Sequence, residues 1–210
     1  MKIKSSGTEI PFLIIQDLYN EDELRMIKKE IDFIHSAGCF TENTGSAVSN
    51  DNKLKKASGV WMDKLYTNRN TSMILKLNTI LFLDEEIMKS FINLSPYYRS
   101  YGAINADTTL MHYYENEDSY GSHNDGAVYS AVTWFFNKPK KFEGGNLTFP
   151  DLNVSIEVED NMSVIFPSML VHKVEQIQMS KSDTNDDEKN GRYSIAQFMF
   201  IVPFNLCRPY

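Results

Sequence analysis

The chain has 210 residues, of which 42% are hydrophobic and 12% aromatic, a size and composition typical of one packed globular domain. Its formal net charge of −7 argues against a broad nucleic-acid surface, which needs clustered lysine and arginine. No stretch approaches the roughly 20 apolar residues of a membrane span, so we expect neither a nucleic acid nor a membrane as partner.

Two cysteines, Cys39 and Cys207, are too few for a disulfide framework. The first residues, MKIKSSGTEIPFLII, lack the apolar core and small-residue cleavage site of a signal peptide. The sequence therefore predicts a soluble cytoplasmic protein, and its acidic character is compatible with either a monomer or a homodimer.

The N-terminal elements alternate apolar runs with helix signals. Residues 10–19 form a short apolar run that predicts a buried strand. Asn20 and Glu23 then have the spacing of a capping box, and Gly38 would end the helix that follows. Residues 39–58 are rich in Asn, Ser, Thr, Gly and Lys; a segment this long is loop-like, and residues 39–69 are a candidate lid.

The strongest helical signal covers residues 70–96. Apolar residues from Met73 to Leu81 form one stripe, Asp84 is placed to cap a further turn, and Pro96 ends the pattern. From Ala103 onward, short strand-like runs alternate with turn residues, as in an antiparallel sandwich or jelly roll. A polar, mostly charged loop is expected between two strands at residues 179–191.

Helices first and strands after predict an α+β protein with a mainly β core, its N-terminal helices packed on one outer face of the jelly roll. We find neither a repeat nor a second composition regime. Residues 1–210 are therefore predicted to form a single domain, with a helical part at about 1–100 and the jelly-roll core at about 101–204.

Two polar residues stand just before a run of β-branched and aromatic residues. His123 and Asp125 flank one residue, so in an extended segment their side chains point to the same side. An imidazole and a carboxylate that converge suit Fe(II), Mn(II) or Zn(II). Strands distant in sequence become neighbours in a jelly roll, so His172 can complete a face of two histidines and one carboxylate with open metal positions.

Arg192 begins a strongly apolar strand, which is a costly place for an unpaired guanidinium. Its planar fork suits a carboxylate held by two hydrogen bonds. Ser194 lies on the same strand face and can add a hydroxyl. A dicarboxylate cosubstrate that chelates iron at one end and pairs with Arg192 at the other would use both features.

This pattern resembles the Fe(II)/2-oxoglutarate-dependent dioxygenases, and within them the prolyl 4-hydroxylase-like branch. The similar stretches are PFLIIQDLYNEDELRMI, YYENEDSYGSHND, FEGGNLTFP, MSVIFPSMLVHKV and GRYSIAQFMFIV. The resemblance is specific over about residues 104–202, weaker over 8–36 and absent over 39–69.

The resemblance implies a double-stranded β-helix that holds Fe(II) through His123, Asp125 and His172. In the family, 2-oxoglutarate chelates the iron through its 1-carboxylate and 2-keto oxygen, and Arg192 would pair with its 5-carboxylate. Reaction with O2 releases succinate and CO2, and ascorbate is an auxiliary reductant. The carboxylate of Asp125 indicates hydroxylation, because halogenating relatives carry a small residue there.

Some cosubstrate contacts depart from the family pattern. Tyr114 matches a tyrosine that often contacts 2-oxoglutarate, but Phe135 stands where some relatives have a second one. If Phe135 points inward, so does Thr133, and if Tyr114 points inward, so does His112. We therefore expect His112 or Thr133 to supply the missing contact; the alternative is that His112 is a core histidine bonded to backbone.

The expected function is hydroxylation of an aliphatic C–H bond in an amino acid, a prolyl peptide or another small molecule. Segments 58–66 and 95–102 could line the substrate mouth or equally anchor the core. Two other functions stay open: a non-catalytic metal-binding jelly-roll module, and a zinc hydrolase with the same ligands. The zinc hydrolase does not explain Arg192 in an apolar strand, and the sequence shows no obvious general base for it.

Overall fold

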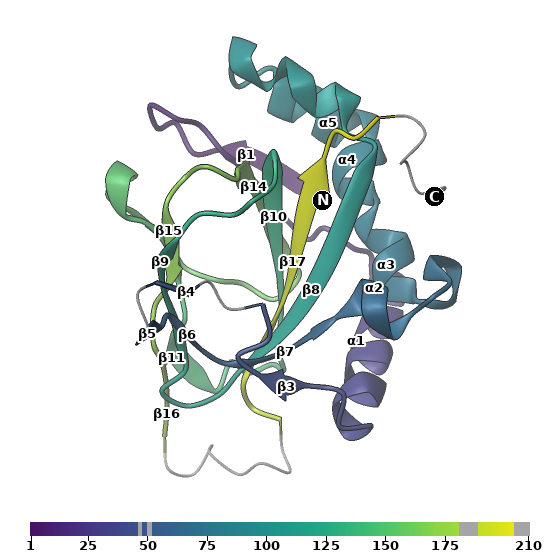
Figure 1. The fold of residues 1–210 in the computed structure, drawn as a ribbon, viewed down its shortest axis with the longest axis vertical. Coiled ribbons are helices and arrows are strands. Elements are labelled where there is room, and N and C mark those ends of the chain that lie inside the picture. Colours follow the sequence, from purple (N-terminus) through teal and green to yellow (C-terminus); the bar gives the residue numbers. More distant parts are fainter. Residues whose placement is uncertain (46–47, 50–51, 181–188, 204–210) are drawn as a thin grey trace.

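Two antiparallel β-sheets face each other in the computed structural model, which describes residues 1–45, 48–49, 52–180 and 189–203 (Figure 1). The larger sheet contains, in spatial order, β1 (Lys2–Ser5), β2 (Leu13–Gln16), β14 (Met162–Pro167), β10 (Tyr129–Phe135), β17 (Arg192–Phe200), β8 (Ala106–Tyr114), β7 (Ser58–Trp61) and β3 (Thr41–Glu42). The smaller sheet contains β13 (Val154–Ile156), β12 (Leu147–Phe149), β15 (His172–Val174), β9 (Ser119–His123) and β6 (Lys55–Lys56). Two short pairs join β11 (Phe142–Gly144) to β16 (Ile177–Met179) and β4 (Val48–Ser49) to β5 (Asn52–Lys53).

The chain crosses repeatedly between the two sheets, so strands distant in sequence pair in space. β10 lies between β14 and β17, and β15 pairs with β9. This connectivity confirms the predicted mainly β fold with a jelly-roll core. The central strands β8 and β17 pair along their whole length in one continuous antiparallel ladder. It runs from Arg192 opposite Tyr114 to Phe200 opposite Ala106.

The helices cover the outer face of the larger sheet, as expected (Figure 1). They are α1 (Glu21–Ser36), α2 (Met62–Leu65), α3 (Met73–Asn78), α4 (Ile80–Leu83) and α5 (Glu85–Ile92), with 3₁₀ turns at Arg69–Thr71, Pro96–Ala103 and Pro150–Leu152. The capping box of Asn20 and Glu23 is confirmed at the start of α1. No helix in the described part of the chain is long and apolar enough to cross a membrane.

The helical signal over residues 70–96 is broken into three short helices rather than one. The Thr79 hydroxyl bonds the Lys76 carbonyl at 2.8 Å, a local bond that competes with helix continuation. Asp84 adopts an extended backbone and accepts from the Glu86 and Ile87 amides, so it caps α5 as predicted.

The two faces of the larger sheet belong to different cores. Its outer face packs with the helices, through side chains such as Ile31 of α1 and Phe91 of α5. Its inner face packs against the smaller sheet in a second core that includes Trp134, Phe149 and Phe166. Because both faces are buried, the central strands carry apolar residues on both sides.

This double burial corrects one prediction. Phe135 lies in the helix-side core and Trp134 in the inter-sheet core, so it is Trp134 that points into the roll. Thr133 shares the side of Phe135 and donates to the Ser163 hydroxyl at 3.1 Å. The prediction that Thr133 faces the interior is wrong, because alternation cannot be assigned to one face when every residue of a strand is apolar or buried.

The candidate lid at residues 39–69 joins both sheets where the structure describes it. β3 and β7 extend the larger sheet, and β6 adds an edge strand to the smaller one. This segment therefore ties the two sheets together at one end. Part of the predicted polar loop at 179–191, together with Cys207, lies outside the described residues.

Candidate metal centre and adjoining cavity

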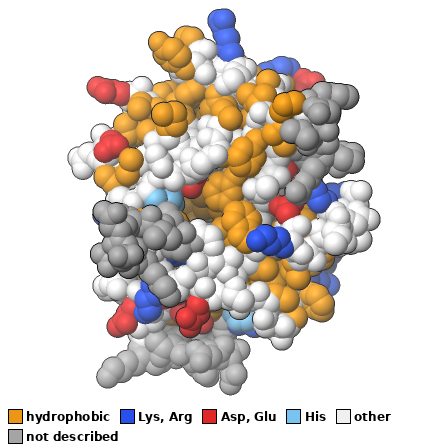
Figure 2. Space-filling model, viewed as in Figure 1, with side chains coloured by type: hydrophobic (Ala, Val, Ile, Leu, Met, Phe, Trp, Pro, Cys, Tyr) orange, Lys and Arg blue, Asp and Glu red, His pale blue; other side chains and the backbone are white. Residues whose placement is uncertain are grey.

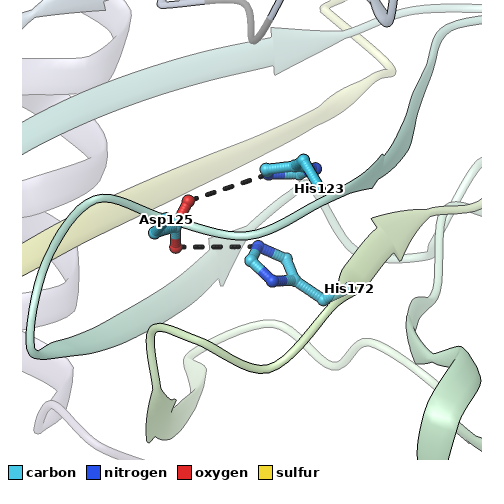
Figure 3. A group of neighbouring side chains, drawn as sticks. All are labelled: His123, Asp125 and His172. Atoms are coloured by element: carbon cyan, nitrogen blue, oxygen red, sulfur yellow. Dashed lines mark ion pairs between the residues drawn. The ribbon is translucent and has the colours of Figure 1, made fainter. Parts of the chain in front are cut away.

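The three predicted metal ligands come together between the sheets (Figure 3). The strand register places His123 at the end of β9 directly opposite His172 at the start of β15. Asp125 follows β9, where its amide donates to the Ser168 carbonyl at 2.9 Å. The Nε2 atoms of His123 and His172 lie 3.8 Å and 3.6 Å from the Asp125 carboxylate oxygens. One potential ligand atom from each of the three residues lies within 4.8 Å of those of the other two.

Both histidines present the ring atom that a metal would need. The Nδ1 atoms of His123 and His172 lie 2.8 Å and 2.9 Å from the carbonyls of Gly121 and Leu170. Donation from Nδ1 leaves the Nε2 lone pair free and aimed at the carboxylate. Burial, and then the neighbouring His172, lower the pKa of His123 to about 4, so its ring is neutral near pH 7.

Asp125 is held by a hydroxyl that sequence reasoning missed. The Ser130 hydroxyl donates to Asp125 Oδ2 at 2.6 Å and lies 2.7 Å from the Ser168 hydroxyl. Such outer-shell bonds orient a ligating carboxylate. Two imidazoles and one oriented carboxylate, all mostly buried, fit a divalent first-row metal with further coordination positions open.

A cavity adjoins the three ligands and runs between the sheets. Its volume is about 60 Å³, several times the ~10–15 Å³ that one water requires. Its lining residues are Gly45, Leu110, His112, Tyr114, Tyr120, His123, Asp125, Val132, Trp134, Leu147, His172, Val174, Arg192, Ser194, Ala196 and Phe198. Most of the lining is apolar, so the few polar groups define what the cavity can hold.

Arg192 is the strongest of these polar groups. It is fully buried, and its Cζ lies 4.5 Å from the ring centroid of Tyr114. Its Nη1 donates to the Gly145 carbonyl, whereas Nε and Nη2 have no hydrogen-bond partner in the described part of the chain. Burial lowers the pKa of Arg192 to about 10, which still leaves the guanidinium positively charged at neutral pH. Two orphaned donors on a buried cation fit a carboxylate ligand.

The other predicted cosubstrate residues divide into two groups. The cavity is lined by His112, Tyr114 and Ser194. In the β8–β17 ladder, His112 lies opposite Ser194, two residues along from the pair of Tyr114 and Arg192. Thr133 does not line it, whereas Trp134 does and was missed. Whether any of them contacts a cosubstrate stays a prediction.

A wider hollow of about 350 Å³ opens outside the metal ligands. It is lined by Gly45, Trp61, Thr108, Tyr120, His123, Asn124, Asp125, Gly126, Phe198 and Phe200. Hydrophobic side chains border the hollow at the centre of this face, with a histidine at its edge (Figure 2). Trp61 thus gives segment 58–66 a place at the mouth, whereas Tyr98 and Tyr101 of segment 95–102 pack in the core against Phe91.

Comparisons with known proteins give relatives by structure alone. No family model matches the chain, and no curated protein matches it by sequence. A prolyl-4-hydroxylase from Pseudomonas putida is similar with a TM-score of 0.57 and 16% identity, over 92% of this chain and 94% of the other. A prolyl hydroxylase from Trichoplax adhaerens, in complex with a hypoxia inducible factor peptide fragment, gives 0.60 and 13%, over 90% and 83%.

A 2OG-Fe(II) oxygenase family oxidoreductase from Burkholderia pseudomallei is also similar, with a TM-score of 0.57 and 12% identity over 91% of this chain and 85% of the other. The chain therefore has the fold of the prolyl 4-hydroxylase-like 2OG-Fe(II) oxygenases, as its sequence motifs predict. At this level of identity the likeness concerns the fold, and the chemistry has to be argued from the site.

Proposed function

We propose that this protein is an Fe(II)- and 2-oxoglutarate-dependent oxygenase that hydroxylates an aliphatic C–H bond. The observation that carries the proposal is one cavity that joins a two-histidine, one-carboxylate face to a buried guanidinium with two orphaned donors. A dicarboxylate that spans the two would satisfy both. The overall reaction consumes 2-oxoglutarate, O2 and the substrate, and yields succinate, CO2 and the hydroxylated product.

The residues divide the work by position. His123, Asp125 and His172 would hold Fe(II), which when bound supplies the redox chemistry that activates O2. Arg192 would bind the 5-carboxylate of 2-oxoglutarate with its free Nε and Nη2 donors. Burial keeps the pKa of Tyr114 above its usual value, so this residue beside Arg192 stays a neutral hydroxyl. The apolar walls exclude water from the reacting atoms.

The substrate enters through the aromatic hollow outside the metal ligands. Trp61, Phe198 and Phe200 give it an apolar wall, and Asp125 is the only carboxylate among its described lining residues. Such a surface suits an amino acid, a prolyl peptide or another small molecule with an apolar part. The Trichoplax neighbour binds a peptide fragment, which supports a peptide as one of these candidates.

The alternative functions are less well supported. A metal-binding module without catalysis gives no role to the orphaned donors of Arg192. A zinc hydrolase needs a general base beside the metal, and Asp125 is the only carboxylate among the described residues that line the cavity.

The deciding experiment is anaerobic titration of Fe(II)-loaded protein with 2-oxoglutarate. A weak visible charge-transfer band is expected, and it should be absent from Asp125→Ala. Admission of O2, with and without ascorbate, should then release succinate. A metal-replete protein that gives neither band nor succinate would contradict the proposal. A screen of amino acids and proline-rich peptides for succinate release, with product masses measured, then identifies the substrate.

A further inference from the structure

Lys55 is a buried cation that has no carboxylate partner among the described residues. Its side chain lies on β6 in the segment that ties the two sheets together, and the residue is 1% exposed. Its Nζ donates to the Thr44 carbonyl and lies 2.9 Å from Nε2 of His112. Burial lowers the pKa of Lys55 to about 8, so the ammonium is the main form at neutral pH.

The neighbouring lysine shows what an ordinary position on this strand looks like. Lys56 is exposed and lies 3.6–3.7 Å from the carboxylates of Asp118 and Glu117. Burying an ammonium with only neutral partners costs free energy, so a cation at position 55 is not explained by the stability of the fold. Its partner His112 lines the cavity, which points to a role in ligand binding.

The contact with Lys55 determines the tautomer of His112. An ammonium can only donate, so Nε2 of His112 must accept. Burial, followed by the charge of Lys55, holds the pKa of His112 well below its usual range, and the ring is neutral. The single ring proton then sits on Nδ1, which has no hydrogen-bond partner among the described residues. His112 itself lines the cavity, so its ring carries an unused donor at the cavity wall.

Three neighbours surround the His112 ring. Gly59 lies opposite His112 in the β7–β8 register, and a Cβ there would come within 3.0 Å of His112 Cδ2. Tyr114 packs edge-on against the ring, with centroids 5.8 Å apart. Ser194 is its register partner on β17. His112 lines the cavity two residues along β8 from Tyr114, on the side of Thr108, which lines the outer hollow.

We propose that Lys55 is a positioning residue, which fixes His112 as an Nδ1–H donor to an anionic oxygen of the carboxylate ligand in the cavity. The identification of that ligand as 2-oxoglutarate rests on the proposed function. Lys55 and Arg192 each offset part of the charge of a dianion, and the arriving dianion compensates the buried ammonium in turn.

The first test measures 2-oxoglutarate binding to Mn(II)-loaded protein by calorimetry. Lys55→Met should weaken binding about 10-fold or more, because the donor to a charged acceptor is no longer fixed. Lys56→Met, on the same strand, should stay within about twofold. Mn(II) affinity and the unfolding midpoint of each variant show that the site and the fold are intact. Equal binding by wild type and Lys55→Met would overturn the proposal.

A second variant separates positioning from a direct electrostatic effect. Asn in place of His112 carries a donor near the former Nδ1 and does not depend on tautomer. If Lys55 acts through His112, adding Lys55→Met to His112→Asn should weaken 2-oxoglutarate binding by less than threefold further. A full 10-fold further loss would mean that Lys55 acts on the ligand without His112, and would refute the positioning role.

The tautomer itself is observable without any ligand. In ¹⁵N-histidine-labelled apoprotein, His112 should show a protonated Nδ1 and a bare Nε2, assigned by its absence from His112→Asn. Lys55→Met should shift the ring toward the Nε2–H form. An Nε2–H tautomer in the wild type would sink the inference. If the wild type binds no 2-oxoglutarate but shows the predicted tautomer, the proposed function fails and the Lys55–His112 pairing stands.

Discussion

The Ser130 hydroxyl donates a 2.6 Å hydrogen bond to the same Asp125 oxygen that lies 3.6 Å from Nε2 of His172. This bond fixes which carboxylate oxygen stays free to face the other histidine, His123. The carboxylate of the candidate metal site is therefore oriented from β10 of the larger sheet, although the two imidazoles come from the smaller sheet.

Removal of this hydroxyl should weaken the metal site without unfolding the protein. We expect Ser130→Ala to lower Mn(II) affinity about 10–100-fold, the usual effect of losing an outer-shell partner. Thr133→Val on the same strand is the matched control, since its hydroxyl bonds Ser163 away from the cavity. Titration followed by electron paramagnetic resonance measures both; equal losses in the two variants would show that Ser130 has no special part in the site.

Arg192 should be required for cosubstrate binding and dispensable for metal binding. Arg192→Met removes the donors Nε and Nη2, and we expect the dissociation constant of 2-oxoglutarate to rise about 30-fold or more. Arg192→Lys keeps a charge but loses the fork, so it should lie in between. Calorimetry on Mn(II)-loaded protein checks both. Unchanged binding in Arg192→Met would place the carboxylate elsewhere.

The clustering of the three candidate metal ligands and the burial of Arg192 could be anticipated from the sequence. A guanidinium in an apolar strand needs an explanation that ordinary packing does not give. The His-x-Asp pair is a weak signal by itself and gains weight only from His172 and Arg192. Their mutual placement followed from the jelly-roll pattern, which brings His172 opposite His123.

Features that depend on tertiary contacts could not be predicted. Trp134 and Phe135 are both buried, on opposite faces of β10, so alternation alone did not reveal which one faces the cavity. Lys55 stands in a segment whose composition indicates a loop, and its burial arises only when β6 pairs with β9. The breaks in the 70–96 helix likewise depend on local caps that compete with a continuous apolar stripe.

The Gly144–Gly145 turn should matter for Arg192 as well as for stability. Gly145 has a φ of 68°, and a Cβ there would lie 2.9 Å from Ile177 Cγ1. Gly145→Ala should lower the free energy of unfolding by about 1–2 kcal/mol from the left-handed backbone alone. Because the Gly145 carbonyl accepts from Arg192, 2-oxoglutarate affinity should fall too. Gly102→Ala, where the nearest atom lies 3.5 Å away, is the control for both measurements.

Histidines whose pKa is lowered in the folded protein should make the apoprotein sensitive to mild acid. Burial is the main cause that lowers the pKa values of His35, His112 and His123, the last to about 4. Between the folded pKa and the unfolded value near 6.5, the unfolded chain binds more protons, so stability rises with pH and is lost as pH falls through this window. A buried histidine that lies fully inside the window contributes a slope of about 1.4 kcal/mol per pH unit. The partly exposed His35 contributes less, because solvent screens it.

Two carboxylates act in the opposite direction at lower pH. Burial raises the pKa values of Asp107 and Asp118, so as pH falls these carboxylates are protonated in the folded state before they are in the unfolded state. The stability that this protonation contributes is lost as pH rises through the raised pKa values. The histidine effect is therefore isolated by comparison with a variant. Urea unfolding of metal-free protein at pH 5.0, 6.0, 7.0 and 8.0 should give a shallower slope for His112→Asn than for wild type below about pH 6.5. Parallel slopes would mean that His112 is protonated in the folded protein, against the neutral ring that its burial beside Lys55 requires.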